Sequence, residues 1–455
     1  MSYNFKKKYL NSKYPHLKLY TNMLLDDVQL LKFINKNKLV TLSNNKKKII
    51  IQINNLLKIN LDKKINQNIY NIINQNLSSE KTLLYLFHNV LSGIYVKIIN
   101  NKIKIFYLFY NENYRNDWLS NVIITNKIKN RLGYNFINNN KLWSVNNCII
   151  NNRNFKNKNT DNLEFNRLLE FKYLLKLVCK KHKIKDCEFI INRRDFPVLR
   201  YDGKHPYTHV YNNITKYNND KFIPIFSQVT SPEYADIPII NVDDIALLTK
   251  ISYPPTNKVS NLPNLVKWQN KKNIAFFRGT ATGCGVTEKT NQRIKLAKIS
   301  YELNNKKILD AGLTSWNYRD KIYNKKITII KPKKLGFPLV NTVTPNEQAY
   351  YKYIIHIDGH VSAYRLTREL YSGSLLLIVK SPKNYSMWFT PLLKEYVHYI
   401  PIKEDLSDLI QKIKWCKEND DKCKKIALAS YDLAINELTI NKALDYMAYA
   451  LNNLK

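Results

Sequence analysis

The chain has 455 residues, of which 44% are hydrophobic and 12% aromatic, so it can form two or three folded domains and is not disordered throughout. No apolar run approaches the roughly 20 residues of a membrane-spanning helix. The basic residues 1–10 are not followed by the apolar segment of a signal peptide, and the six cysteines include no Cys-x-x-Cys pair. Composition therefore predicts a cytoplasmic protein with reduced thiols and no membrane span.

The charge balance is strongly basic, with 73 lysine and arginine residues against 35 acidic residues and a formal net charge of +38. A charge of this size could form a nucleic-acid-binding surface. Much of the excess is lysine interleaved with asparagine and isoleucine, as in residues 44–50, which is typical of an AT-rich genome such as that of a large DNA virus. Because no helix-turn-helix, zinc-finger or RNA-recognition pattern is visible, nucleic acid stays the weaker alternative.

The first half of the chain predicts one α/β domain behind a segment without motifs. Residues 1–90 show only weak helical periodicity, so they form an N-terminal segment of unassigned role. Residues 91–255 combine strand and helix patterns. The expected elements are a hairpin of strands 95–99 and 103–107, a polar loop at 151–162, a helix marked by Leu168, Phe171, Leu175 and Val178, and a strand at 187–191.

A second α/β pattern follows a linker of prolines and asparagines at residues 254–263, and we assign residues 256–455 to it. The expected elements are strands at 274–277, 353–357 and 374–379, a helix from about Ser362 to Tyr371, and further helices over residues 405–455. Two such domains would face each other across a cleft, a favoured position for ligand sites.

The first segment that carries chemistry is residues 357–365, where a strand ends, Gly359 permits a turn and a helix begins. Backbone N–H groups at a helix start suit a diphosphate, Ser362 could cap the helix, and Arg365 could bind phosphate through two nitrogens. A strand, a turn and a capped helix with one arginine are also common without any ligand. Both interpretations stay open for this segment.

The second segment is residues 277–285, followed at a distance by Arg293. Its glycines are similar to those of a phosphate loop, but the Gly-Lys-Ser/Thr ending is missing, and a structural turn is the alternative.

In the third segment Asp195 follows a strand in a turn stiffened by Pro197, between Arg193 and Arg194 on one side and Phe196 on the other. Asp195 could be a catalytic base or the partner of a structural salt bridge.

Taken together, these segments resemble glycosyltransferase family 90, which includes capsule-associated glycosyltransferases and protein O-glucosyltransferases. The resemblance covers residues 186–430. Its motifs, in order, are Asn-x-Arg-Asp-aromatic-Pro; Phe-Phe-Arg-Gly-Thr/Ser with a later Arg; Tyr-Lys-Tyr-x-x-x-x-Asp-Gly with Arg seven residues after the Asp; Tyr-Ser-Gly-Ser-Leu from Tyr371; and His-Tyr-Ile-Pro from His398, leading to Asp-Leu-Ser-Asp-Leu.

The resemblance implies a GT-B fold of two Rossmann-like domains facing a cleft, a UDP-sugar as donor substrate, no cofactor and no metal. It also implies inverting transfer of a hexose or pentose, as in UDP-glucosyl or xylosyl transfer, to a hydroxyl of a protein serine or threonine or of a glycan. Asp195 matches the catalytic base. The matched nucleotide-binding positions are Arg278, Gly279, Thr280, Arg293, Asp358, Gly359, His360, Val361, Ser362, Ala363, Tyr364 and Arg365.

Three departures from the family pattern leave the donor sugar open. Ala363 stands where a serine often precedes the arginine by two residues, with Ser362 offset by one. Thr280 replaces the usual serine, and the pair Glu395-Tyr396 replaces Pro-Trp.

Independence from metal has support from the residues themselves. Inverting transfer needs one base and positive charge on the departing diphosphate, and an arginine with a helix N-terminus could supply that charge. No Asp-x-Asp pair follows a strand near the motifs, and the adjacent pairs Asp243-Asp244 and Asp420-Asp421 fall at expected helix starts or loops.

Two alternatives from other functional classes remain. The fold could be retained without catalysis, leaving a scaffold or a sugar-nucleotide binder, or the basic surface could make the chain a nucleic-acid-binding protein. The presence of both Asp195 and Arg365 favours an enzyme.

Overall fold

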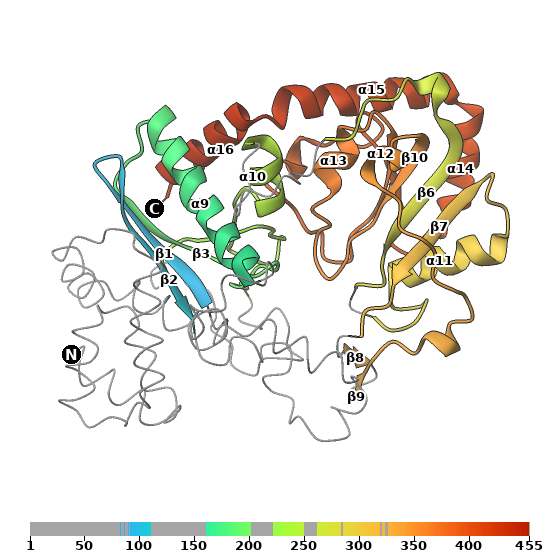
Figure 1. Cartoon of the computed structure of the whole chain (residues 1–455), viewed down its shortest axis with the longest axis horizontal. Helices are drawn as coiled ribbons and strands as arrows, with labels where there is room; N and C mark the ends of the chain where they lie inside the picture. Colours follow the sequence, from blue (N-terminus) through green and yellow to red (C-terminus); the bar gives the residue numbers. More distant parts are fainter. Residues whose placement is uncertain are drawn as a thin grey trace. The chain divides into compact units, whose positions relative to one another are not determined.

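The computed structural model describes residues 92–110, 161–201, 222–249, 262–283, 285–318, 321–323 and 326–454, together with Thr82, Leu86 and Val90, and Figure 1 shows the whole chain. The chain divides into two compact units, each described by itself below. Unit 1 comprises Met1–Ser227, Glu233–Ile237 and Met447–Lys455, and unit 2 comprises Gln228–Pro232 and Pro238–Tyr446. The predicted linker and the boundary between residues 255 and 256 lie almost wholly outside the described residues, so the predicted domain bounds stay predictions.

Unit 1 contains a five-stranded sheet in the order β2-β1-β3-β4-β5, with the strands β1 (Ser92–Ile99), β2 (Lys102–Tyr110), β3 (Cys187–Ile191), β4 (Ile225–Ser227) and β5 (Ile237–Pro238). β1 is antiparallel to both β2 and β3, whereas β3 is parallel to β4. The predicted hairpin is confirmed. Asn100 and Asn101 turn it with φ angles of 51° and 58°, a left-handed backbone that asparagine tolerates in two-residue hairpin turns.

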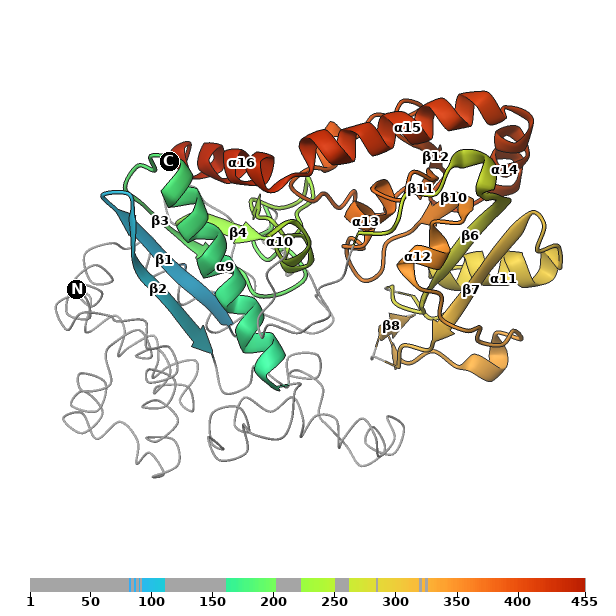
Figure 2. The same cartoon turned by 45° about the horizontal axis from the view of Figure 1, so that its top comes forward.

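The helix α9 (Asp161–Lys181) packs against β2 of this sheet (Figures 1 and 2). Phe171, Leu175 and Val178 are almost completely buried, so the helical spacing of apolar residues correctly identified the buried face. The helix begins at Asp161, so residues 161 and 162 of the predicted loop are helical. The sheet of unit 1 is mixed, with the predicted hairpin antiparallel and β3 parallel to β4, so the two Rossmann-like domains implied by the family resemblance stay an expectation for this unit.

Unit 2 contains a parallel sheet in the order β12-β11-β10-β6-β7, with the strands β6 (Lys272–Thr280), β7 (Leu309–Ser315), β10 (Tyr351–His356), β11 (Leu375–Val379) and β12 (Ile400–Ile402). All four neighbouring pairs are parallel. β6 is the first of these strands in the chain and lies between the second, β7, and the third, β10. This is a doubly wound order whose direction of winding reverses between β6 and β10.

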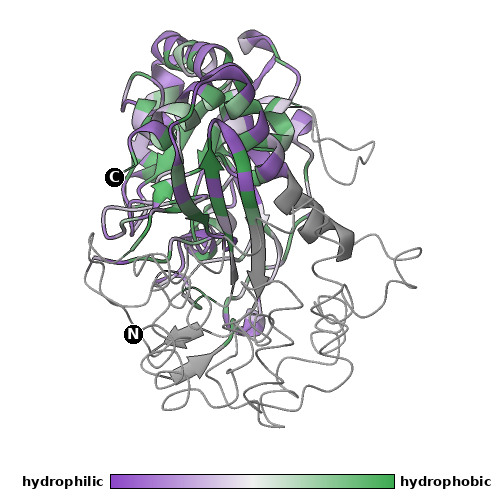
Figure 3. Cartoon of the chain, turned by 90° about the vertical axis from the view of Figure 1, so that its left-hand side faces the viewer, coloured by the Kyte–Doolittle hydropathy of each residue, from purple (hydrophilic) through white to green (hydrophobic). Residues whose placement is uncertain are grey.

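A continuous apolar core lies on one side of this sheet, where side chains of alternate strand residues meet α11 (Gln292–Leu303), α14 (Leu409–Glu418) and α15 (Asp420–Glu437). Figure 3 shows green and purple mixed along the described helices, as in amphipathic helices. The remaining elements of the described chain are α10 (Val242–Thr249), α12 (Pro345–Gln348), α13 (Leu366–Leu370), α16 (Ile440–Asn452), the hairpin β8 (Lys321–Tyr323) and β9 (Lys326–Thr328), and the 3-10 helices η6 (Trp268–Asn270), η7 (Pro332–Lys334) and η8 (Thr390–Leu392).

Two local predictions were wrong. β6 does not end at residue 277 but continues to Thr280, because Arg278, Gly279 and Thr280 all pair with β7. The helix expected from Ser362 begins only at Leu366, so it has five residues and Ser362 does not cap it. Within the described parts of the chain, no helix is long and apolar enough to cross a membrane.

Candidate functional site

The carboxyl ends of β6 and β10 are joined by the guanidinium of Arg293, which projects from the first turn of α11. Its Nε donates to the carbonyl of Asp358 at 2.8 Å, its Nη2 to Ile357 at 3.0 Å, and its Nη1 to Thr280 at 3.1 Å. Burial and the charge of Arg365 lower the pKa of Arg293 to about 9, so it stays cationic at neutral pH. Arg293 therefore acts as a structural bridge between two motifs that are far apart in the sequence.

Two glycines of these motifs, Gly279 and Gly359, lie where there is little room for a side chain. A Cβ atom added to Gly359 would lie 2.7 Å from Oγ1 of Thr282, and one added to Gly279 would lie 3.0 Å from the ring of Phe277. A side chain at Gly359 would therefore meet the segment that follows β6, whereas one at Gly279 would meet the ring of Phe277 in its own strand. Close packing thus gives both glycines a structural role.

Arg278 turns away from the strand ends. Its Nη2 binds both carboxylate oxygens of Asp310 at 2.8 and 3.0 Å, and its guanidinium lies 4.6 Å from the ring centroid of Phe276. Asp310 pairs with Phe276 in the register of β6 and β7, so Arg278 reaches back along the sheet. Thr280 is also engaged, because its hydroxyl lies 2.8 Å from that of Ser315.

Arg365 occupies the other side of the bridge, directly before α13. Its Nη1 donates to the carbonyl of Arg278 at 2.6 Å, and its guanidinium stacks on Phe277 at 4.9 Å from the ring centroid. Its Nη2 is buried and has no hydrogen-bond partner within the described part of the chain. We call Arg278, Arg293, Arg365 and their contacts the arginine site.

Glu369 completes the arginine site. Its Oε1 lies 3.0 Å from Nε of Arg365, an ion contact that is not an aligned hydrogen bond, and its Oε2 lies 2.5 Å from Nδ1 of His356. Burial raises the pKa of Glu369, but His356 and Arg365 outweigh burial and hold the pKa below its usual value. Glu369 is therefore an ionised, buried carboxylate at neutral pH.

The segment between β10 and α13 contains the other predicted nucleotide-binding positions, which are Asp358, Gly359, His360, Val361, Ser362, Ala363 and Tyr364. It turns through hydrogen bonds of its own. The N–H of Gly359 donates to the carbonyl of Val361 at 2.9 Å, and the N–H of Ala363 to the carboxylate of Asp358 at 3.3 Å. Burial raises the pKa of Asp358. The structure thus brings this segment, Thr280, Arg293 and Arg365 together at one point of the sheet.

Asp195 lies in unit 1, in the bend that follows β3, and is half-buried. The amide of Asn192 shapes this bend by donating to the carbonyl of Phe196 at 2.6 Å and to the hydroxyl of Ser227 at 3.0 Å. Its oxygen accepts from the N–H of Arg194 at 2.9 Å. The backbone on both sides of Asp195 is therefore fixed by one buried side chain.

The exit of the bend is held by Asp236, whose carboxylate accepts from the N–H groups of Val198 and Leu199 at 2.9 and 2.8 Å and from the hydroxyl of Ser227 at 2.5 Å. Burial raises the pKa of Asp236 to about 6. Arg194 directs Nε and Nη2 to the carbonyl of Val90, at 3.0 and 2.5 Å. We call residues 192–199 the Asp195 turn.

Across the described ranges, no group of three or more histidine, cysteine, aspartate or glutamate side chains could hold a metal ion. Asp243 and Asp244 lie in the first turn of α10, and Asp420 and Asp421 in the first turn of α15, as the sequence predicted. The carboxylate of Asp420 accepts hydrogen bonds from Nζ of Lys352 and Nε1 of Trp268.

The fold and the arginine site together define an α/β protein with a cationic site at the point where the winding of a parallel sheet reverses. In such sheets ligands bind at the carboxyl ends of the strands at this point. The sequence profile of glycosyl transferase family 90 matches residues 136–454. The chain therefore belongs to glycosyl transferase family 90, as its motifs predicted.

Individual relatives include viral and animal proteins. The chain is 34% identical over 403 residues to "Uncharacterized protein 035R" of Invertebrate iridescent virus 3, covering 82% of this chain and 36% of that protein. It is 31% identical over 257 residues to human "Protein O-glucosyltransferase 3", covering 56% of this chain and 44% of that protein. The chain thus spans less than half the length of these curated relatives.

Among solved structures, the chain is similar to that titled "Crystal Structure of TarM", at 13% identity over 42% of this chain and 39% of that chain. The TM-score of 0.29 is too low to carry an argument about the fold.

Sequence reasoning did not find Asp310, Glu369, His356 or Asp236. A signal existed for Glu369, because an acidic residue four positions after an arginine in a helical pattern is a common ion pair. Asp310 and Asp236 carry no such signal, since their partners Arg278 and Val198 are 32 and 38 residues away.

Proposed function

We propose that this protein is an inverting, metal-independent glycosyltransferase that moves a hexose or pentose from a UDP-sugar to a hydroxyl of a protein or glycan. The observation that carries the proposal is the arginine site, in which a buried nitrogen of Arg365 has no hydrogen-bond partner within the described residues. This nitrogen lies where sheets of this order bind ligands. Membership of family 90 and similarity to a protein named as an O-glucosyltransferase support the reaction class.

The donor would bind at the arginine site through its diphosphate. Nη2 of Arg365 would donate to a phosphate oxygen, and the cation would stabilise the charge that forms on UDP as the sugar leaves. Arg293 would contribute through position and charge, because its guanidinium holds three carbonyls of the site. Arg278 and Thr280 would act mainly through their backbone, since Asp310 and Ser315 engage their side chains.

Asp195 would be the general base. It would take the proton of the acceptor hydroxyl while that oxygen bonds to the anomeric carbon and the bond to the UDP oxygen breaks. The Asp195 turn supports this role, because Asn192 and Asp236 fix its backbone by hydrogen bonds that do not involve the carboxylate of Asp195. A rigid backbone around a base lowers the cost of orienting it.

The test is a screen of UDP-sugars, with UDP-glucose and UDP-xylose first, in which release of UDP is measured with and without hydroxyl acceptors. We expect one donor to be hydrolysed above the level of heat-inactivated protein, and UDP to bind in calorimetry. Binding of UDP without turnover of any donor would favour the inactive sugar-nucleotide binder. Salt-dependent retention of DNA or RNA without UDP binding would favour the nucleic-acid alternative.

A further inference from the structure

The carboxylate of Glu369 lies between two groups that come from different elements of unit 2. His356 is the last residue of β10, and Arg365 directly precedes α13, which contains Glu369 itself. Glu369 contacts both side chains, with Oε2 at 2.5 Å from Nδ1 of His356 and Oε1 at 3.0 Å from Nε of Arg365. Glu369 is only 5% exposed and His356 only 4%, so water does not replace these contacts.

The contacts of Arg365 restrict its guanidinium to one orientation. The group is planar and rigid, so fixing two of its nitrogens fixes the third. Glu369 holds Nε, and the carbonyl of Arg278 holds Nη1 at 2.6 Å. Phe277 supports the plane of the group from one face. Nη2, which has no hydrogen-bond partner among the residues the structure describes, is thereby directed by Glu369.

We propose that Glu369 is a positioning residue for the donor site, which holds Arg365 so that Nη2 meets an oxygen of a nucleoside diphosphate, and that His356 fixes Glu369 in turn. The inference rests on the proposed function, because it assumes that the arginine site binds the diphosphate. It adds two residues to that site that no family motif above contains.

A purely electrostatic role for Glu369 makes the opposite prediction. If the carboxylate only compensated the charge of Arg365, then Glu369→Gln would make the site more positive and would tighten the binding of an anion. If Glu369 positions Arg365, the same variant frees the guanidinium and weakens binding. The sign of the change in UDP affinity therefore separates the two roles.

The experiment is calorimetry with UDP on the full chain, combined with donor kinetics and thermal melts. We expect Glu369→Gln to bind UDP about 10- to 100-fold more weakly, the scale of one charge-assisted hydrogen bond. Glu369→Asp keeps the charge but is one methylene shorter, so it should lose less. The donor KM should rise more than kcat falls.

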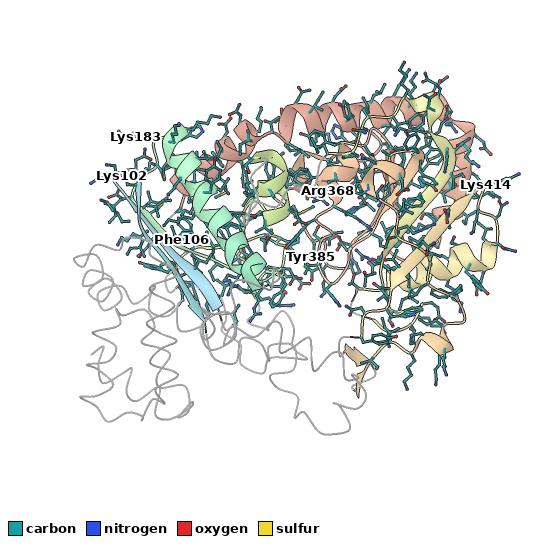
Figure 4. The ribbon with its side chains drawn as sticks, in the orientation of Figure 1. Lys102, Phe106, Lys183, Arg368, Tyr385 and Lys414 are labelled. Carbon is teal, nitrogen blue, oxygen red and sulfur yellow. The ribbon has the colours of Figure 1, made fainter. Side chains whose placement is uncertain are left out.

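The matched control is Arg368→Ala, which removes a cation from the same helix (labelled in Figure 4) and should change UDP affinity less than threefold.

A double-mutant cycle tests whether Glu369 acts through Arg365. If Glu369 acts through Arg365, Glu369→Gln should have no further effect on UDP affinity in an Arg365→Met background. Unchanged or tighter UDP binding by Glu369→Gln would overturn the inference, as would an equal loss in both backgrounds. Should Glu369→Gln not fold, wild-type affinity in Glu369→Asp and in His356→Gln would overturn it equally. Absence of UDP binding by the wild-type chain would instead remove the proposed function, and the inference with it.

Discussion

The Asp195 turn and the arginine site are built in different ways. In the Asp195 turn the amide of Asn192 donates to the carbonyl of Phe196, and the carboxylate of Asp236 accepts from the N–H groups of Val198 and Leu199. The arginine site is held by cations that reach carbonyls and carboxylates, such as Arg293 to Asp358 across 65 residues and Arg365 to Arg278 across 87. In the first region two side chains fix one short backbone segment, and in the second arginine side chains join segments that are far apart in the sequence.

This difference determines how each region should respond to substitution. In the Asp195 turn the side chains of Asn192 and Asp236 hold the backbone, so we expect a change at Asp195 to affect chemistry more than stability. In the arginine site the guanidinium groups that hold the strand ends are also those proposed to meet the donor, so we expect binding and local structure to be coupled. Five predictions test this comparison.

The largest effect is expected for Asp195→Asn, which keeps the shape of the side chain and removes its basic charge. Turnover should fall roughly 10²- to 10⁴-fold, the share of general base catalysis, while UDP affinity and melting temperature barely change. The measurement pairs the transfer rate with a thermal melt of the same variant. A variant that melts early yet transfers sugar at the wild-type rate would make Asp195 a structural partner.

The contrasting variant in the same turn is Asn192→Ala. It leaves the buried carbonyl of Phe196 and the N–H of Arg194 without their side-chain partner. Stability should fall by about 1–3 kcal/mol, the cost of leaving buried polar groups unmatched. An early melt here together with an unchanged melt for Asp195→Asn would confirm the separation of the two tasks.

The second effect concerns binding. Arg365→Ala should weaken UDP binding by about 1.5–3 kcal/mol, because a charge-assisted hydrogen bond to the diphosphate is lost. Arg365→Lys should recover only part of the loss, since an ammonium cannot bind Glu369, the carbonyl of Arg278 and the ligand in one plane. Calorimetry measures both, and an unchanged affinity in Arg365→Ala would contradict the assignment of the donor site.

The third effect compares two buried carboxylates, Asp236 in unit 1 and Asp244 in unit 2, whose pKa values are both raised to about 6 by burial. A raised pKa in the folded state means that the folded chain binds more protons than the unfolded chain. The contribution of each carboxyl group to the free energy of unfolding is therefore complete below about pH 4 and is lost as the pH rises through about 6. Wild-type stability should fall over this interval in thermal melts.

The two carboxylates should nevertheless differ on substitution. In Asp244 one oxygen accepts from both Trp388 and Asn241, so Asp244→Asn keeps these bonds, flattens the pH dependence and stabilises by up to about 3 kcal/mol at pH 7. Asp236 uses both oxygens for the N–H groups of Val198 and Leu199, so Asp236→Asn breaks one bond and should gain less or lose stability. Equal responses of the two variants would contradict this account.

The smallest effect is expected from removal of metal. Because the arginine site supplies the positive charge in the proposed mechanism, EDTA should leave UDP-sugar turnover unchanged. The check is a rate measured before and after chelation, with Mn²⁺ and Mg²⁺ added back. A strict requirement for either ion would transfer the charge stabilisation from Arg365 to a metal.

Much of the local structure could be predicted because it depends on nearby residues. The period-two and period-3.6 patterns identified the hairpin, the buried face of α9, the strands β3 and β11 and the helical end of the chain. Errors arose where a distant partner decided the outcome. Arg278, Gly279 and Thr280 look like a turn in sequence, yet hydrogen bonding to β7 keeps them in the strand.

The sequence by itself determined the family and the residue types of both candidate regions, because ordered motifs need no knowledge of contacts. Only the tertiary structure decided how each arginine is engaged. Arg278 binds both carboxylate oxygens of Asp310 and Arg293 binds three carbonyls, whereas Nη2 of Arg365 is buried and has no hydrogen-bond partner among the described residues. The physical reason is that a guanidinium has no fixed role of its own, since acceptors brought close by the parallel sheet determine whether it supports the fold or meets a ligand.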